Sequence, residues 1–138
     1  NLHSILTKNL EVSSGIRKNK VAITGTEYSP LSNSKEIENA LQKIVNTTNE
    51  VDFPLTKALL VALMIAYLQP FVDGNKRTSR ILANAILIAH DLYPLSYRDV
   101  NIIEYIKAMI LFYETNNIYH FKRMFINQYN FSVNNYFQ

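Results

Sequence analysis

Residues 69–80 read Gln-Pro-Phe-Val-Asp-Gly-Asn-Lys-Arg-Thr-Ser-Arg and join two apolar segments, residues 58–68 and 81–89. Pro70 disfavours helix at Gln69. The Asp-Gly-Asn triplet is typical of a turn that needs a positive φ. The sequence therefore predicts one helix, a tight loop, and a second helix that begins at about Lys76.

The start of this second helix is strongly cationic. Helix starts present unsatisfied N–H groups and the positive end of the dipole, and Lys76, Arg77 and Arg80 add three cationic side chains. Such a cluster is unfavourable unless an anion offsets it, so we expect a phosphate site, with Asp73 as a ligand for Mg²⁺. The simpler alternative is that Asp73 caps the helix, Asn75 makes a turn, and the cations are solvated.

The composition is that of a single globular domain. The chain has 138 residues, of which 48% are hydrophobic and 18% charged, and it has no cysteine that could form a disulfide or act as a thiolate nucleophile. The net charge of +3 is mild and not gathered in a basic block, so nucleic acid is not expected as a partner. The longest apolar run, residues 58–68, is far shorter than the ~20 residues that span a bilayer.

No signal-peptide pattern opens the chain, which favours a cytoplasmic location, or delivery into a host cell if the protein is an effector. The chain begins at Asn1 inside an amphipathic segment. We therefore expect it to be a fragment of something longer.

Hydrophobic periodicity predicts a mainly α fold around the central helix-loop-helix. The expected helices cover approximately residues 2–10, 34–45, 54–68, 75–89, 100–115 and 119–129, with Asn33 and Asp99 as N-caps. Residues 20–28 differ, because Val21, Ile23 and a Thr-Gly-Thr turn at residues 24–26 predict two short strands of a β-hairpin.

The stretch at residues 69–80 resembles the signature of the Fic domain family (filamentation induced by cAMP; Fic/Doc superfamily), His-Pro-Phe-x-Asp/Glu-Gly-Asn-Gly/Lys-Arg-x-x-Arg. The matching residues are Pro70, Phe71, Asp73, Gly74, Asn75, Lys76, Arg77 and Arg80. The likeness extends from residues 14–17 to residues 112–125. It implies one Fic-like domain over residues 1–138, a helical bundle with a β-hairpin flap at about residues 20–29.

Most members of this family transfer AMP from ATP to a hydroxyl of a target protein. The resemblance implies that Asp73 holds Mg²⁺ and that the backbone of residues 74–76 cradles the phosphates. It also implies that Arg77 binds a bridging phosphate and Arg80 the γ-phosphate. The expected ligands are therefore ATP and Mg²⁺, and the expected product is an AMP-modified Ser, Thr or Tyr.

The flap of the family implies a second partner. It would dock a target protein by main-chain pairing, and Gly25 and Thr26 are the residues that the resemblance places there. A surface hairpin without any partner is an equal alternative from the sequence.

The first signature position departs from the family, because Gln69 stands where the family has its catalytic His. An amide cannot take up a proton, and general base catalysis is typically worth ~10² to 10⁴ in rate. We therefore expect nucleotide binding with weak or absent transfer. A natural pseudoenzyme, an altered mechanism and an experimenter's substitution all remain open.

Two other functions remain as alternatives. The first is a non-catalytic module that binds nucleotide and a protein partner. The second is phosphotransfer as in the related Doc toxins, which have Lys at the place of Lys76. Gly74 and Arg80 follow the AMP-transferring pattern instead, so adenylyl transfer is the first choice among the catalytic functions.

Overall fold

The computed structural model describes residues 2–6, 8, 15–98 and 100–136, and in these residues the fold is entirely helical. The helices are α1 (Leu2–Leu6), α2 (Ser34–Asn49), α3 (Pro54–Leu68), α4 (Asn75–Ala89), α5 (Ile102–Thr115) and α6 (Tyr119–Tyr136). The predicted helical bundle is thus confirmed. Helices α2 and α6 continue beyond their predicted ends, to Asn49 and Tyr136.

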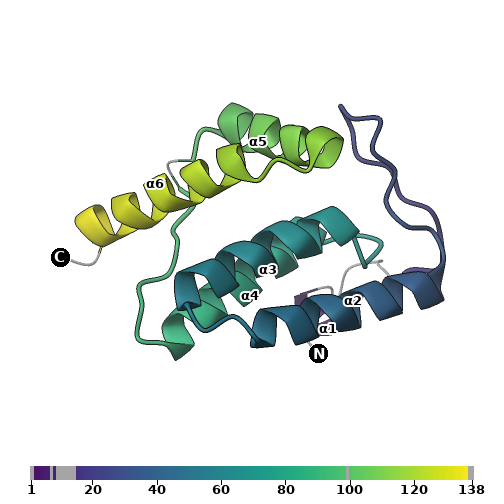
Figure 1. Ribbon diagram of the computed structural model, residues 1–138, viewed down its shortest axis with the longest axis horizontal. Helices are drawn as coiled ribbons and strands as arrows, with labels where there is room; N and C mark the ends of the chain where they lie inside the picture. Colours follow the sequence, from purple (N-terminus) through teal and green to yellow (C-terminus); the bar gives the residue numbers. More distant parts are fainter. Residues whose placement is uncertain (1, 7, 9–14, 99, 137–138) are drawn as a thin grey trace.

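Helix α3 is the centre of the bundle. It packs against α4, α2 and α6, and α5 forms a hairpin with α6 on the side away from α2 (Figure 1). Its side chains are apolar on nearly every face, and Ala58, Leu63 and Ala66 are fully buried. Nevertheless, none of the helices in the described residues is both long and apolar enough to cross a membrane.

The helix boundaries follow local chemistry. Asn33 caps α2 by accepting N–H bonds from residues 35 and 36, and Pro54 occupies the first turn of α3, where a missing N–H costs nothing. Helix α5 is capped by Asn101, whose side chain accepts from the N–H of Ile103. The predicted cap, Asp99, lies outside the described residues.

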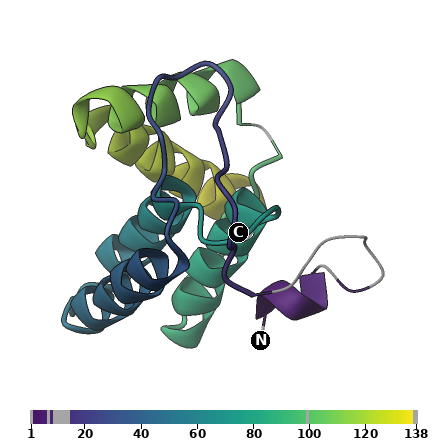
Figure 2. The ribbon, with the colours of Figure 1, turned by 90° about the vertical axis from the view of Figure 1, so that its right-hand side faces the viewer.

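The prediction of a β-hairpin at residues 20–29 is wrong, because the two strands do not form in this described stretch. Residues 20–33 contain the expected turn, at residues 24 and 25, but form no strand in the described structure. This segment, residues 20–33, is called the flap segment below; it instead forms an arch that reaches α5 (Figure 2). Its polar groups bond to the helices: the N–H of Glu27 donates to Glu114, and the Tyr28 hydroxyl donates to the carbonyl of Tyr67. Contacts with the bundle thus replace pairing between the two arms, which is marginal in an isolated hairpin.

Buried tyrosines predict alkaline instability. Burial raises the pKa of Tyr28, Tyr97 and Tyr113 well above 10, the ordinary value for tyrosine. Above pH 10 the unfolded chain releases these protons while the folded chain keeps them, so the unfolded state is favoured as the pH rises. We expect the free energy of unfolding to fall above pH 10, by up to about 1.4 kcal/mol per pH unit for each of Tyr97 and Tyr113, and by less for Tyr28, which is only half-buried.

Urea denaturation followed by circular dichroism, from neutral pH to about pH 11, measures this fall. Tyr97→Phe should make it less steep, because the variant has one titrating group fewer. A free energy of unfolding that does not change with pH above 10 would contradict the prediction.

Candidate functional site

The loop between α3 and α4, residues 69–74, is called the signature loop below. Two residues in the left-handed region bracket it: Gln69, at φ 50° and ψ 57°, ends α3, and Gly74, at φ 78°, precedes α4. Non-glycine residues rarely adopt this conformation, and where they do, the surroundings must hold them there.

The buried side chain of Asn75 closes the signature loop. Its Oδ1 accepts from the N–H of Phe71 at 2.8 Å, and its Nδ2 donates to the carbonyl of Phe71 at 2.8 Å and to Oε1 of Gln69 at 3.1 Å. The sequence predicts a backbone role for Asn75 at a phosphate. In addition, the structure gives its side chain a task that the sequence did not indicate, namely fixing the shape of the loop.

The side chain of Arg17 also holds the signature loop, and it is only 1% exposed. Its Nε donates to the carbonyl of Gln69 at 2.6 Å, while its two Nη atoms donate to the carbonyls of Asn19 (3.0 Å) and Leu68 (3.5 Å). Its own N–H donates to the carbonyl of Pro70 at 3.0 Å. Burial lowers the pKa of Arg17. Arg17 therefore anchors both the end of α3 and the beginning of the signature loop.

His3 contacts the other side of the loop. Its ring stacks on Phe71 with centroids 3.8 Å apart, and its Nε2 lies 2.9 Å from the carbonyl oxygen of Asp73, to which it donates. Sequence reasoning assigned His3 no role. The structure makes it a packing residue that holds the loop against α1.

The start of α4 differs from the starts of α2 and α5. In those two helices an Asn side chain caps the first turn, and an acidic residue lies within it, Glu36 or Glu104. Among the described residues, α4 has neither a capping side chain nor an acid in its first turn. The acid next to this helix start is Asp73, which precedes the N-cap Gly74 and accepts from its N–H. No acid lies in the first turn itself, where Lys76 and Arg77 oppose the helix dipole.

Two of the three predicted cations, Lys76 and Arg77, are exposed on this first turn. The one ion pair found in the described part of the chain joins Lys35 to Glu38, on the exposed surface of α2. Lys76, Arg77 and Arg80 thus have no carboxylate partner within the described residues. Their charges remain available to an anionic ligand.

Arg80 is half-buried and held more firmly than the other two cations. Its Nε donates to the carbonyl of Lys76 at 3.3 Å, and its guanidinium carbon lies 5.4 Å from the centre of the Tyr97 ring. Tyr97 has a left-handed backbone, at φ 57°. A cation over an aromatic face is stabilised electrostatically, so Tyr97 restrains where Arg80 can point.

Asp73 is exposed and contributes the only acidic side chain of the signature loop. Its Oδ1 accepts from the N–H of Gly74 at 2.6 Å. The described residues contain no group of three His, Cys, Asp or Glu side chains that could enclose a metal ion. A lone carboxylate can hold Mg²⁺ where water and phosphate oxygens supply the other ligands.

Gln69 uses both ends of its side-chain amide within the protein. Its Nε2 donates to the carbonyl of Ala66 at 2.6 Å, and its Oε1 accepts from Asn75. The amide therefore stabilises the end of α3.

Gly25 and Thr26, the two residues predicted for the flap, contact α5 and not the signature loop in the described structure. The hydroxyl of Thr26 donates to Oε1 of Glu114, which also accepts from the N–H of Glu27 at 3.0 Å. Gly25, at φ 88°, faces Ile110, whose Cδ1 would lie 3.4 Å from an added Cβ. Glu114 was not indicated by the sequence, because only the fold brings it beside residues 88 positions earlier in the chain.

A family profile and individual proteins similar to this chain both point to one protein family. Residues 1–87 match the profile of the Fic/DOC family. The chain is 33% identical over 110 residues to a probable protein adenylyltransferase of Aquifex aeolicus (strain VF5), a match that covers 78% of this chain and 33% of that protein. It is 41% identical over 49 residues to the protein adenylyltransferase Fic of Nematostella vectensis, covering 36% of this chain and 12% of that protein.

Among solved structures, Fic-1 from C. elegans has a similar fold, with a TM-score of 0.74 at 21% identity. The match covers 98% of this chain and 40% of that one. The chain spans 33% of the length of the Aquifex aeolicus protein and 12% of that of the Nematostella vectensis protein.

Proposed function

The chain belongs to the Fic/DOC family, and from this premise we propose that it binds ATP with Mg²⁺ at the signature loop and the start of α4. We further propose that the bound ATP is the donor of AMP to a Ser, Thr or Tyr hydroxyl of a target protein, with transfer attenuated by Gln69. Residues 1–138 would form one domain that carries this site.

One observation carries the proposal more than any other. The start of α4 has neither a side-chain cap nor an acid in its first turn, and it presents Lys76 and Arg77 to solvent. Cations there oppose the helix dipole, and the neighbouring carboxylate of Asp73 offsets only part of this positive charge, which favours the binding of an anion. A triphosphate offsets both the dipole and the side-chain charges.

The chemistry then assigns a task to each residue. The target oxygen forms a bond to the α-phosphorus while the bond from that phosphorus to pyrophosphate breaks, so negative charge grows on the leaving group. Backbone N–H groups of residues 74–76 would hold the phosphates, and Arg77 and Arg80 would neutralise the pyrophosphate. Asp73 would hold Mg²⁺, which supplies further charge neutralisation when bound.

The target hydroxyl must also lose its proton, and Gln69 would occupy the position of the base. An amide has no basic nitrogen, and the amide of Gln69 is already bonded to Ala66 and Asn75. This geometry favours attenuated transfer. It also supports the second candidate, a module that binds nucleotide and a protein without catalysis.

The target protein would dock at the flap segment, around Gly25 and Thr26. Since this segment has no strand partner in the described structure, its backbone outside the turn is compatible with pairing to a target peptide. The bonds from Thr26 and Glu27 to Glu114 would set the position of the segment relative to the bundle.

The experiment that separates these functions follows the label from ATP. The protein and its Gln69→His variant are incubated with Mg²⁺, a cell extract as a source of targets, and ATP labelled at either the α- or the γ-phosphate. Protein labelled from the α-phosphate alone supports adenylyl transfer. Label from the γ-phosphate supports a Doc-like phosphotransferase, and ATP binding without label from either variant supports the non-catalytic module.

Tyr97 offers a test of the proposed role of Arg80. Tyr97→Leu removes the aromatic face under the guanidinium, and we expect it to weaken ATP binding about three- to tenfold while changing ADP binding little, because Arg80 would contact the γ-phosphate. Tyr97→Phe keeps the ring and should bind ATP nearly as tightly as the unaltered protein. Calorimetry with Mg²⁺ measures the affinities, and equal losses in the Leu and Phe variants would refute this role.

A further inference from the structure

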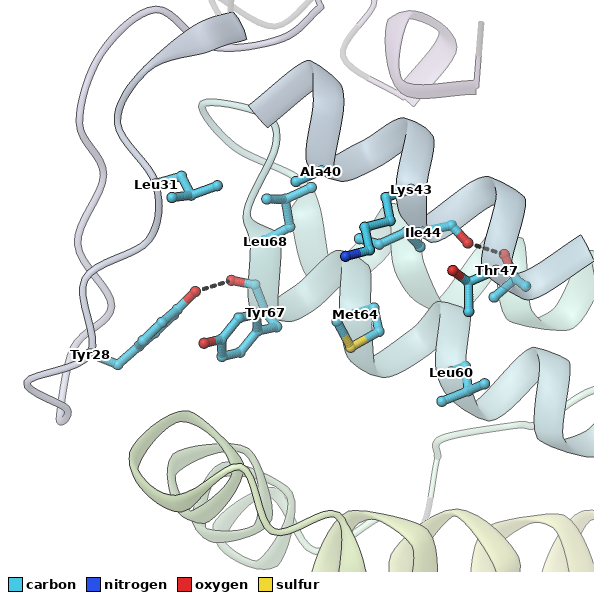
Figure 3. Close-up of a pocket in the computed structure, with 11 residues that line it drawn as sticks. Tyr28, Leu31, Ala40, Lys43, Ile44, Thr47, Leu60, Met64, Tyr67 and Leu68 are labelled. Atoms are coloured by element: carbon cyan, nitrogen blue, oxygen red, sulfur yellow. Dashed lines mark hydrogen bonds between the residues drawn. The ribbon is translucent and has the colours of Figure 1, made fainter. Parts of the chain in front are cut away.

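A cavity separate from the signature loop lies between the flap segment, α2 and the face of α3 that carries Leu60 and Met64. It has a volume of about 390 Å³, within the range typical of small-ligand pockets. Tyr28 and Leu31 of the flap segment, Ile44 of α2, and Leu60 and Met64 of α3 form its apolar walls (Figure 3). None of the residues proposed to bind the nucleotide lines it.

Lys43 gives this apolar cavity a positive charge. Among the described residues it is the only charged side chain in the lining, and Figure 3 shows its amine directed toward the side of Met64. The positions three and four residues away on α2 hold Asn39, Ala40, Asn46 and Thr47, so no acid lies where a helical ion pair would form.

Lys35 shows what such a pair looks like on the same helix. Its Nζ lies 3.1 Å from Glu38, three residues further along. No ion pair involving Lys43 occurs within the described part of the chain. Lys43 therefore places a charge at the mouth of an apolar cavity without a counter-ion among the described residues.

Two of the polar side chains in the lining, Tyr28 and Thr48, bond within the protein. The hydroxyl of Tyr28 donates to the carbonyl of Tyr67 at 2.9 Å, and the hydroxyl of Thr48 donates to carbonyls of the preceding turn of α2. The side chains of Tyr67 and Thr47 also line the cavity, so it offers a ligand a mainly apolar surface, two hydroxyls and one ammonium group. The complementary ligand has an apolar body and one negative charge.

We propose that this cavity is a binding site for a small carboxylate with an aliphatic or aromatic tail, and that Lys43 pairs with the carboxylate. The site is independent of the proposed nucleotide chemistry. Its walls nevertheless include Tyr67 and Leu68, the last residues of α3 before Gln69, so a ligand would contact the helix end from which the signature loop starts.

Methionine methyl groups provide the readout. The chain has three methionines: Met64 lines the cavity, Met109 is buried in the core, and Met124 lies on α6. With ¹³C-methyl methionine, octanoate should shift the Met64 resonance in a saturable way and leave that of Met109 unchanged. 1-Octanol, the neutral probe of equal length, should bind at least tenfold more weakly.

Two matched variants test the charge. Lys43→Met should weaken octanoate binding about tenfold or more without changing 1-octanol binding, and it should fold normally because the residue is exposed on α2. Lys35→Met, on the same helix but outside the cavity, should leave both affinities unchanged. The proposal is overturned if octanoate does not shift Met64 at about 10 mM, if both variants weaken binding equally, or if octanoate and 1-octanol bind with the same affinity.

Discussion

Gln69→His should raise the rate of AMP transfer by about 10² to 10⁴, the range that a general base typically contributes. An imidazole can donate one N–H while its other nitrogen stays available as a proton acceptor near neutral pH. The carbonyl of Ala66, which now accepts from the Gln69 amide at 2.6 Å, is a ready acceptor for that N–H. The variant would thereby keep the bond that holds the end of α3 and gain a base.

Binding of ATP should change little in the same variant. Arg80 is positioned by Tyr97 and by the carbonyl of Lys76, and Lys76 and Arg77 are exposed on α4, so none of the three cations depends on Gln69 for its position. We therefore expect a large change in kcat and less than a threefold change in ATP affinity.

The rate is measured from incorporation of label from the α-phosphate, either into a target or into the protein itself. Gln69→Asn is the matched control, because it keeps an amide but provides no base, and its rate should stay at or below that of the unaltered protein. If Gln69→His binds ATP normally and still transfers no AMP, the adenylyltransferase proposal fails and the non-catalytic module is favoured.

The central helix-loop-helix could be predicted from sequence because its determinants are local. Pro70 and the Asp-Gly-Asn triplet specify the loop, and the apolar runs on either side specify the helices. The structure begins α4 at Asn75, within one residue of the predicted start. The cluster of Asp73, Lys76 and Arg77 is likewise brought together by adjacency in the chain.

The supporting contacts could not be predicted, because they join residues far apart in sequence. Arg17 meets the carbonyl of Gln69 across 52 positions, and His3 meets Asp73 across 70. Only the folded topology creates these pairs, and an isolated Arg in a sequence is usually a surface residue. The β-hairpin prediction failed for the related reason that long-range bonds to Glu114 and Tyr67 replaced the local pairing.

Arg17→Met should lower the free energy of unfolding by about 2 to 4 kcal/mol. The last carbonyls of a helix have no partner within it. In α3 these carbonyls are satisfied from elsewhere: that of Ala66 by Gln69 and Tyr113, that of Tyr67 by Tyr28, and those of Leu68 and Gln69 by Arg17.

Met fills much of the same space as Arg but donates nothing, so the substitution leaves two carbonyls at the end of α3 without their buried partner. The cost is high because hydrogen bonds from a charged donor are strong and a desolvated carbonyl is expensive to leave unbonded. Lys18→Met is the matched control: the neighbouring Lys18 is exposed, and its loss should change the free energy of unfolding by no more than about 0.5 kcal/mol.

The same substitution should weaken ATP binding under conditions where the protein is still folded, because the left-handed backbone of Gln69 is held partly by the bond from Arg17 to its carbonyl. Urea denaturation gives the stability and calorimetry gives the ATP affinity. Arg17→Lys keeps the charge without the planar fork and should lie between Met and the unaltered protein in both measurements. If Arg17→Met proves as stable as Lys18→Met, then water can replace the guanidinium at the end of α3, and Arg17 does not hold the signature loop.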